Sequence, residues 1–290
     1  MLSSRLMVSI PSRGPSKAAA SQMARDAVAV IESGAYTAPS GARVDIREAI
    51  ARAVAGTREI RPDDAIPTPE RAGVHARLES SHETSLACAA RLGAGGERVL
   101  VLNFASAKNP GGGFLNGARA QEESLARASA LYACLSRKEM YTHHRASHDA
   151  MYTDWCIYSP DVPVFRDDAG AWLETPQLVS FLTSPAPNAG VVLEREPSRA
   201  GEVLEVLSRR AARVLAIARA FGHTRLVLGA WGCGVFGNDP EAVADTFDAA
   251  LRGPFAGCFE HVVFAVYDTT QDQRNYGPFA RRWPPLATDA

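Results

Sequence analysis

The spacing of apolar and polar residues predicts alternating helices and strands along most of the chain. The segments 21–36 ("SQMARDAVAVIESGAY") and 47–57 ("REAIARAVAGT") have apolar residues at helical spacing. The run 98–106 ("RVLVLNFAS") is mostly apolar and β-rich, which is typical of a strand buried in a mixed or parallel sheet. Segment 123–135 ("ESLARASALYACL") predicts one helix whose apolar face consists of Leu125, Ala128, Tyr132 and Leu135.

The second half of the chain repeats this alternation. Two short strand-like runs that prolines interrupt occupy 155–165 and 178–188, and a long helix is expected over 203–221. The C-terminal region then predicts a strand, a glycine-rich loop, a helix and a strand, at 224–231, 232–238, 239–253 and 261–268. Strands that alternate with helices predict an α/β layered domain.

The chain is expected to form one domain with an N-terminal addition. Residues 1–20 are rich in Ser, Pro, Lys and Ala and are predicted to be a flexible tail. Residues 21–75 are predicted to form a helical extension, and residues 76–290 the α/β core. We find neither an internal repeat nor a linker that would divide this core.

Composition and charge restrict the ligand and the compartment. With 31 basic and 32 acidic residues the net charge is −1, so an acidic ligand must be held by local groups and not by a global positive field. The five cysteines include no CxxC pair and are expected to be reduced thiols. No apolar run has the length of a membrane span or a signal peptide, so a cytoplasmic protein is expected.

The glycine-rich loop 232–238 ("GCGVFGN") is one candidate for phosphate binding. Gly232, Gly234 and Gly237 match G-x-G-x-x-G between a predicted strand and a helix, where backbone amides bind phosphate without lysine. A nucleoside triphosphatase is excluded because Asn238 and Asp239 replace the required Lys and Ser/Thr. A dinucleotide dehydrogenase is excluded because too few residues follow to complete its sheet. A simple turn between strand and helix remains an equally good interpretation here.

A second candidate lies in 109–132 ("NPGGGFLNGARAQEESLARASALY"), where three glycines precede Glu122 and Glu123. Taken alone, the two acids are best interpreted as helix-start residues, with Glu123 one turn before Arg127. The adjacent glycines change this interpretation, because bare backbone can approach a ligand beside carboxylates able to act on it. Two such loops in one α/β domain predict a diphosphate ligand held from both sides.

Several motifs together resemble the bacterial-type poly(ADP-ribose) glycohydrolases. The resemblance is carried by "GGG" followed by "QEE", and by "YSPDVPVFRDD", "TSPAPN" and "VLGAWGCGVFGNDP". It extends from about Met23 to the last strand and implies a macrodomain-like three-layer α/β/α sandwich with a mixed central sheet. Ordinary macrodomains have Asn-Ala-Ala-Asn in the first loop. This chain keeps Asn103 but has Ser106 in the second position, which leaves Asn109 as an alternative contact to the distal ribose.

The resemblance implies an enzyme that hydrolyses ribose–ribose O-glycosidic bonds of poly(ADP-ribose) from chain ends and releases ADP-ribose. Glu123 is the implied catalytic acid and base, and Glu122 holds ribose hydroxyls. Phe236 is implied to pack against the distal ribose. The expected substrate-binding residues are Asn103, Asn109, Gly111, Gly112, Gly113, Gln121, Gly232, Cys233, Gly234, Val235, Phe236, Gly237 and Asn238.

The expected partners are poly(ADP-ribose), ADP-ribose and ADP-ribosylated proteins. A monomer without cofactor or metal is expected, and neither nucleic acid nor membrane binding. A non-catalytic ADP-ribose reader is the alternative, and the complete "QEE" favours the enzyme. His144 and His148 have the spacing of metal ligands, but a solvated helix end is the preferred interpretation. Cys233 at a helix start is expected to be a small loop residue and not a nucleophile.

Overall fold

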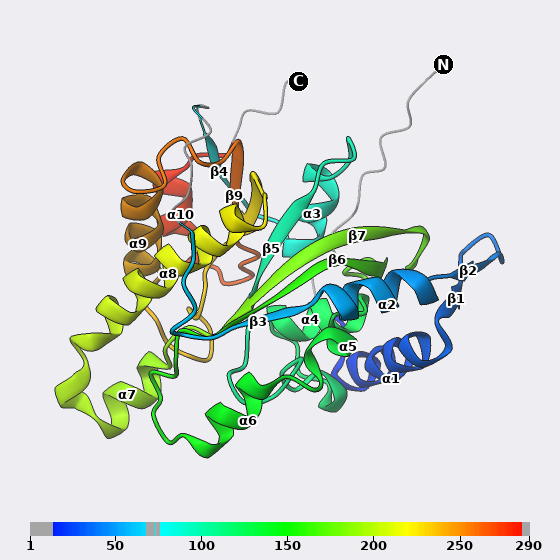
Figure 1. The fold of residues 1–290 in the computed structure, drawn as a ribbon, viewed down its shortest axis with the longest axis horizontal. Coiled ribbons are helices and arrows are strands. Elements are labelled where there is room, and N and C mark those ends of the chain that lie inside the picture. The colour runs from blue at the N-terminus through cyan, green and yellow to red at the C-terminus, as the bar shows by residue number, and fades with distance from the viewer. Residues whose placement is uncertain (1–13, 68–72, 74–75, 286–290) are drawn as a thin grey trace.

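A seven-stranded mixed sheet forms the centre of the protein (Figure 1). A computed structural model describes residues 14–67, 73 and 76–285 of the 290-residue chain. The strands lie in the order β3 (Arg58–Ile60), β6 (Cys156–Arg166), β7 (Trp172–Ser184), β5 (Val99–Phe104), β8 (Arg225–Leu228), β9 (His261–Ala265) and β4 (Arg77–Ser81). The five strands from β7 to β4 are parallel, whereas β6 is antiparallel to both β7 and β3. The mixed sheet expected for the fold is confirmed.

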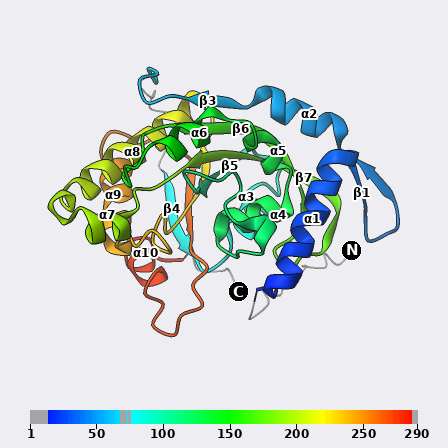
Figure 2. The same ribbon diagram turned by 90° about the horizontal axis from the view of Figure 1, so that it is seen from below.

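Helices cover both faces of this sheet, which gives the expected three layers (Figure 2). One face carries α1 (Lys17–Ser33), α2 (Arg47–Gly56), α3 (Ser85–Leu92), α4 (Gln121–Ala128), α5 (Leu131–Leu135) and α6 (Glu139–Ala146). The other face carries α8 (Glu202–Ala220), α9 (Pro240–Arg252) and α10 (Tyr276–Arg282), and α7 (Ala189–Arg195) precedes α8.

The central strand β5 shows why the sequence forms this arrangement. Val99 and Val101 belong to the core beneath α1 to α6, whereas Leu100 and Leu102 belong to the core beneath α8 to α10. Because successive side chains of a strand point to opposite faces, a strand between two layers must be apolar at every position. The uninterrupted apolar run of the sequence is therefore confirmed as a buried central strand.

The N-terminal region is attached to the core more closely than its prediction as a helical extension implies. Of the predicted tail at 1–20, residues 1–13 lie outside the described residues, and helix α1 already begins at Lys17. Strand β3, within the predicted extension, pairs with β6 at the edge of the sheet. The hairpin of β1 (Ala35–Thr37) and β2 (Arg43–Asp45) connects α1 to α2.

The predicted single helix over 123–135 is wrong, because the chain forms two short helices there. Ser129 is extended (φ −144°, ψ 173°) and makes an isolated β-bridge to Val164. The Ala130 amide donates to the Pro163 carbonyl at 3.0 Å. Backbone hydrogen bonds to β6 therefore replace helical ones and end α4 after two turns.

Strand β6 has 11 residues, as many as the predicted run 155–165, whereas β7 has 13 and begins at Trp172, six residues before the predicted run 178–188. The pairing register shifts between Ser159 and Val162, and Pro160 lies within this irregularity. Proline is tolerated at such a position because no ladder hydrogen bond is required of it. In the part of the chain that the structure describes, no helix combines the length and apolar character needed to cross a bilayer.

Candidate active site

The two glycine-rich loops and the start of α4 surround one cavity of about 480 Å³. Its walls also include the start of α3 and the residues that follow β5, β8 and β9. The cavity thus lies at the carboxyl ends of parallel strands, where open α/β sheets bind ligands. Residues of both glycine loops thus line one cavity, and a diphosphate held by both loops stays a prediction.

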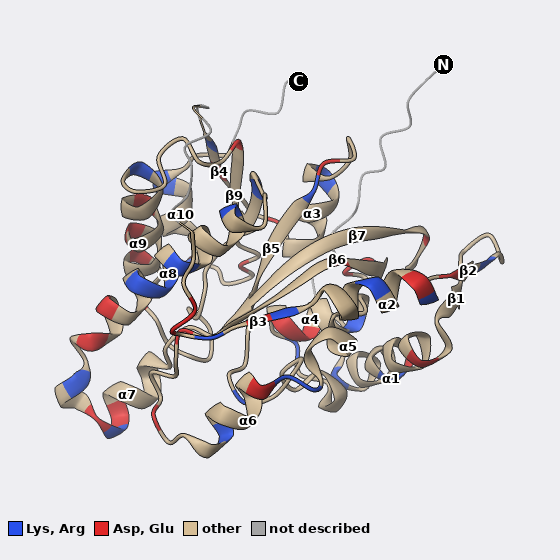
Figure 3. Cartoon of the chain, viewed as in Figure 1, with Lys and Arg blue, Asp and Glu red and all other residues tan. Residues whose placement is uncertain are grey.

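Backbone groups dominate the walls where an anion would bind. Among the described residues that line the cavity, Arg119 is the only basic one, while Glu83, Glu122, Glu123 and Asp168 are acidic. Over the whole fold, Lys and Arg are interspersed with Asp and Glu, as on α7, α8 and α9 (Figure 3). An anionic ligand in this cavity therefore depends on backbone amides.

Gly112 is fixed by both its backbone and its neighbours. Its φ is +60°, in the left-handed region that glycine adopts without strain. A Cβ built there would lie 2.2 Å from Oε1 of Glu123 and 3.1 Å from Oε2 of Glu122. Any side chain at this position would displace a carboxyl group.

Glu123 has one carboxyl oxygen held and the other available. Oε1 accepts a hydrogen bond from the Gly113 amide at 2.9 Å. Oε2 is buried and has no hydrogen-bond partner within the described protein. The residue is 8% exposed and lines the cavity. A buried acceptor without a partner is costly, so this oxygen is suited to a ligand group.

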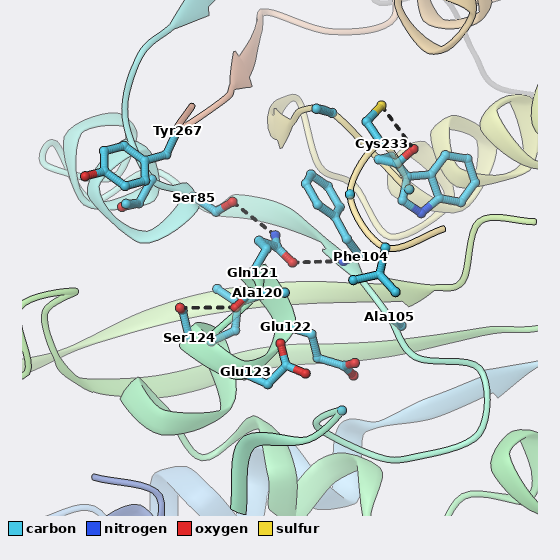
Figure 4. A pocket seen from close by; sticks show the side chains of 18 of the residues that line it. Ser85, Phe104, Ala105, Ala120, Gln121, Glu122, Glu123, Ser124, Cys233 and Tyr267 are labelled. Carbon is cyan, nitrogen blue, oxygen red and sulfur yellow. Dashed lines mark hydrogen bonds between the residues drawn. The ribbon is translucent and has the colours of Figure 1, made fainter. Parts of the chain in front are cut away.

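Glu122, although adjacent to Glu123 in the chain, is held by different hydrogen bonds. Its Oε2 accepts from the Ser106 amide at 2.6 Å, and its Oε1 accepts from Nδ2 of Asn103 at 3.4 Å. Burial raises the pKa of Glu122 to about 8, and the adjacent Glu123 also raises it, although both hydrogen bonds favour the ionised form. Figure 4 shows both side chains leaving the first turn of α4 with their carboxyl groups at separate positions.

Gln121 fixes the start of α4 against the sheet. Its Oε1 accepts from the Phe104 amide at 2.9 Å. Its Nε2 donates to Oγ of Ser85 at 3.0 Å (Figure 4). The same Nε2 donates to the Leu102 carbonyl at 2.9 Å. The first residue of the "QEE" motif therefore positions the two acids relative to β5 and α3.

The two candidate asparagines have different environments. Asn109 lines the cavity. Asn103 is fully buried, does not line the cavity, and donates to Thr183 Oγ1 at 3.1 Å as well as to Glu122. The Asn103 amide supports Glu122, and its expected direct contact with the ligand stays a prediction.

The second loop combines packed and open glycines. A Cβ at Gly232, where φ is +75°, would lie 2.4 Å from Nδ2 of Asn238 and 2.6 Å from the Ala186 Cβ. Nothing lies within 4 Å of the Cβ position of Gly234, which lines the cavity. Asn238 closes the loop by donating to the Pro187 carbonyl at 2.8 Å and the Gly232 carbonyl at 3.2 Å.

Most of the predicted site residues line the cavity, and four of them do not. The residues on the wall are Asn109, Gly112, Gly113, Gln121, Glu122, Glu123, Gly232, Cys233, Gly234, Val235 and Phe236. The predicted residues behind the wall are Asn103, Gly111, Gly237 and Asn238. These four contribute backbone turns or buried amides that shape the wall.

The surroundings of Cys233 and His144 bear on the two alternative sites, a cysteine nucleophile and a histidine metal site. Burial raises the pKa of the Cys233 thiol, which disfavours the thiolate a nucleophile needs. His144 is fully buried, so its prediction as part of a solvated helix end is wrong. Its ring nitrogens contact the Ala107 carbonyl and Thr153 Oγ1.

Several wall residues escaped the sequence prediction. They are contributed by α3, the β6–β7 turn, and the segment after β9, and include Ser85, Asp168, Tyr267 and Asn275. Thr84 caps α3, since its Oγ1 accepts from the Ala87 amide at 3.2 Å. Such a cap is recognisable in sequence, but its place beside the cavity depends on long-range strand pairing.

The chain is similar to a family of known proteins and to several solved structures. Residues 24–167 match the family model described as microbial-type PARG, catalytic domain. The poly(ADP-ribose) glycohydrolase of Thermomonospora curvata is 52% identical, with a TM-score of 0.86 over 91% of this chain and 99% of that chain. The same protein bound to the inhibitor ADP-HPD gives a TM-score of 0.84 over the same shares of the two chains, again at 52% identity.

A second bacterial structure is also similar. The poly(ADP-ribose) glycohydrolase of Deinococcus radiodurans in complex with ADP-ribose is 47% identical, with a TM-score of 0.75. The match covers 80% of this chain and 96% of that chain. A search of curated proteins gives no match.

Proposed function

The chain belongs to the microbial-type poly(ADP-ribose) glycohydrolase family, and we propose that it hydrolyses the ribose–ribose O-glycosidic bonds of poly(ADP-ribose), acting from chain ends and releasing ADP-ribose. Glu123 carries this proposal. Its carboxyl group lies between the two glycine loops, with one oxygen fixed by the Gly113 amide and the other without a partner in the described protein.

The cavity supplies the contacts that an ADP-ribose unit needs. The diphosphate binds to amides of 234–236 in the second loop, which line the cavity and add fixed positive dipoles without a lysine. The amides of Gly112 and Gly113 already donate to the Asn109 carbonyl and to Glu123 Oε1, so the first loop holds the acids and not, as expected from the sequence, the diphosphate. Asn109 and Glu122 bind hydroxyls of the distal ribose, and the Phe236 ring packs against that sugar. The substrate's reactive bond then lies beside Glu123.

Hydrolysis requires one group that first gives and then takes a proton. Protonated Glu123 donates its proton to the departing 2′-oxygen of the neighbouring unit as the bond from that oxygen to the ribose C1″ breaks. The resulting oxocarbenium-like ribose is attacked by water, and Glu123 accepts the proton that this water loses. This scheme departs from the usual pair of glycosidase carboxylates.

Glu122 supports this scheme through its protonation state. Because burial raises its pKa to about 8, it is mostly neutral at pH 7. Neutral Glu122 keeps an O–H donor for a ribose hydroxyl. We also propose that the protein acts as a cytoplasmic monomer on ADP-ribosylated proteins.

The test is incubation with poly(ADP-ribose) followed by chromatography of the products. Wild type should release ADP-ribose, and Glu123→Gln should lose about 10²- to 10⁴-fold in kcat, since general acid–base catalysis contributes that much. The same variant should bind ADP-ribose with little change in calorimetry. Glu194→Gln, at an exposed position of α7, is the matched control and should be fully active.

Three outcomes decide between the candidates. A fully active Glu123→Gln enzyme refutes the proposed acid. Binding of ADP-ribose by wild type without any product indicates the non-catalytic reader. ADP-ribose oligomers among the first products would show that the enzyme cleaves internal bonds and not chain ends.

A further inference from the structure

The Phe236 ring is supported from behind by residues that do not line the cavity. The Tyr152 ring packs against it with a centroid distance of 5.9 Å and an interplanar angle of 44°. The Phe236 carbonyl accepts a hydrogen bond from the Gly190 amide at 2.9 Å. The Asn188 amide in turn donates to the Ala150 carbonyl at 2.9 Å, which ties the two supporting segments together.

Tyr152 has an unusual backbone conformation for an aromatic residue. Its φ is +55°, in the left-handed region where a residue other than glycine is strained. Asp149 holds this backbone conformation through two hydrogen bonds. Its carbonyl accepts from the Tyr152 amide at 3.3 Å, and its Oδ1 accepts from the Met151 amide at 2.8 Å. Arg199 lies 3.2 Å from the Asp149 carboxylate and fixes it.

His144 connects Tyr152 to the first loop of the cavity. Its Nδ1–H donates to the Ala107 carbonyl at 3.2 Å, and its Nε2 accepts from the Thr153 amide at 3.2 Å and hydroxyl at 2.8 Å. One neutral tautomer satisfies all three contacts, and burial lowers the pKa of His144 to about 4. Its ring packs against Tyr152 at a centroid distance of 5.6 Å.

The Ala107 contact matters because of its position in the chain. Ala107 follows Ser106, whose amide holds Glu122, and precedes Asn109 on the cavity wall. His144 and Tyr152 therefore form a continuous connection between the loop that positions Glu122 and the ring of Phe236. Neither residue lines the cavity, so their influence on a ligand must pass through these loops.

We infer that Tyr152 is a positioning residue for the glycosidic reaction, held in a strained backbone by Asp149 and His144 so that its ring keeps Phe236 over the reacting ribose. This inference rests on the proposed function. Strain that the surrounding structure maintains beside a ligand site is expected where a side chain must be placed accurately. Loss of the Tyr152 ring should release Phe236 without removing any atom from the cavity wall.

A double-mutant cycle on poly(ADP-ribose) hydrolysis tests this inference. Tyr152→Leu should lower kcat/KM about tenfold, within the range found for coupled neighbours. Tyr152→Phe keeps the ring and should retain wild-type turnover. Because Tyr152 acts through Phe236, the Tyr152→Leu/Phe236→Ala double variant should be no slower than Phe236→Ala alone. Additive losses in this cycle would overturn the inference.

Two further variants separate positioning from general stability. Tyr152→Gly accepts the positive φ without strain and removes the ring, so it should remain folded and lose turnover as Tyr152→Leu does. Tyr36→Leu removes an aromatic stack on Trp172 (5.5 Å) outside the cavity wall and should lower the melting temperature without changing kcat. If wild type does not cleave the polymer, the proposed function fails; if wild type cleaves it and Tyr152→Gly is fully active, only the inference about Tyr152 fails.

Discussion

Replacing Glu122 by Gln should stabilise the fold, and the gain should depend on pH. The Glu122 carboxyl group is buried, and its pKa rises from 4.5 to about 8 on folding. In Glu122→Gln the new Oε1 can accept from the Ser106 amide as before. The new amide nitrogen needs an acceptor, and Oδ1 of Asn103 is buried without a partner in the described protein. If the side-chain amide of Asn103 rotates by about 180°, its Oδ1 accepts from Nε2 of the introduced Gln side chain and from the Thr183 hydroxyl.

The magnitude follows from the two pKa values. Below pH 4.5 both the folded and the unfolded protein keep the proton, so Glu122 costs no stability. Between pH 4.5 and 8 only the unfolded protein releases it, so the free energy of unfolding falls by about 1.4 kcal/mol per pH unit. At pH 7 this amounts to about 3 kcal/mol, and above pH 8 the cost no longer grows. The Gln variant does not titrate and avoids the cost.

Urea denaturation at pH 4, 7 and 9 measures this difference. We expect Glu122→Gln to exceed wild type by about 3 kcal/mol at pH 7 and to match it near pH 4. The control Glu194→Gln, exposed on α7, should follow wild type at each pH. Equal stability of wild type and Glu122→Gln at pH 7 would show that Glu122 is ionised in the folded protein and refute the reasoning. Hydrolysis by Glu122→Gln should fall less than by Glu123→Gln, since some contact to the ribose hydroxyls remains.

Three other changes have defined outcomes. Gly112→Ala should abolish hydrolysis in a folded protein, because its Cβ meets Glu123 Oε1; normal kcat would show that this carboxyl group can move freely. Gly234→Val should keep the melting temperature and lose ADP-ribose binding in calorimetry, since its side chain enters open space in the cavity; unchanged affinity would place the diphosphate elsewhere. Activity should persist in excess chelator, because a carboxyl group does the chemistry and both His144 nitrogens are engaged by Ala107 and Thr153; loss restored by a divalent ion would contradict this.

Much of the fold and the chemistry was predictable from sequence because the signals are local. Helix α1 and strand β5 follow from the spacing of apolar residues, and Gly34 ends α1 in the left-handed conformation that glycine allows. The glycine loops and the pair Glu122–Glu123 are likewise short motifs. Glycines indicate exposed backbone amides and glutamates indicate an acid or base, whatever the fold around them.

The tertiary structure decided what depends on distant partners. Ser129 ends α4 because it bridges to Val164, 35 residues later, and His144 is buried because it contacts Ala107, 37 residues earlier. The wall contributed by α3 and Tyr267 exists because β4 pairs with β9, which no local pattern specifies.

The division between the two glutamates has the same origin. In sequence they are equivalent neighbours, and a helix only directs them about 100° apart. In the fold, Ser106 and Asn103 hold Glu122 in a buried position, while Gly113 holds only one oxygen of Glu123. The sequence therefore determined which chemical groups are present, and the tertiary structure determined their burial and hydrogen bonds, because the protonation state of a carboxyl group is set by the residues that surround it in space.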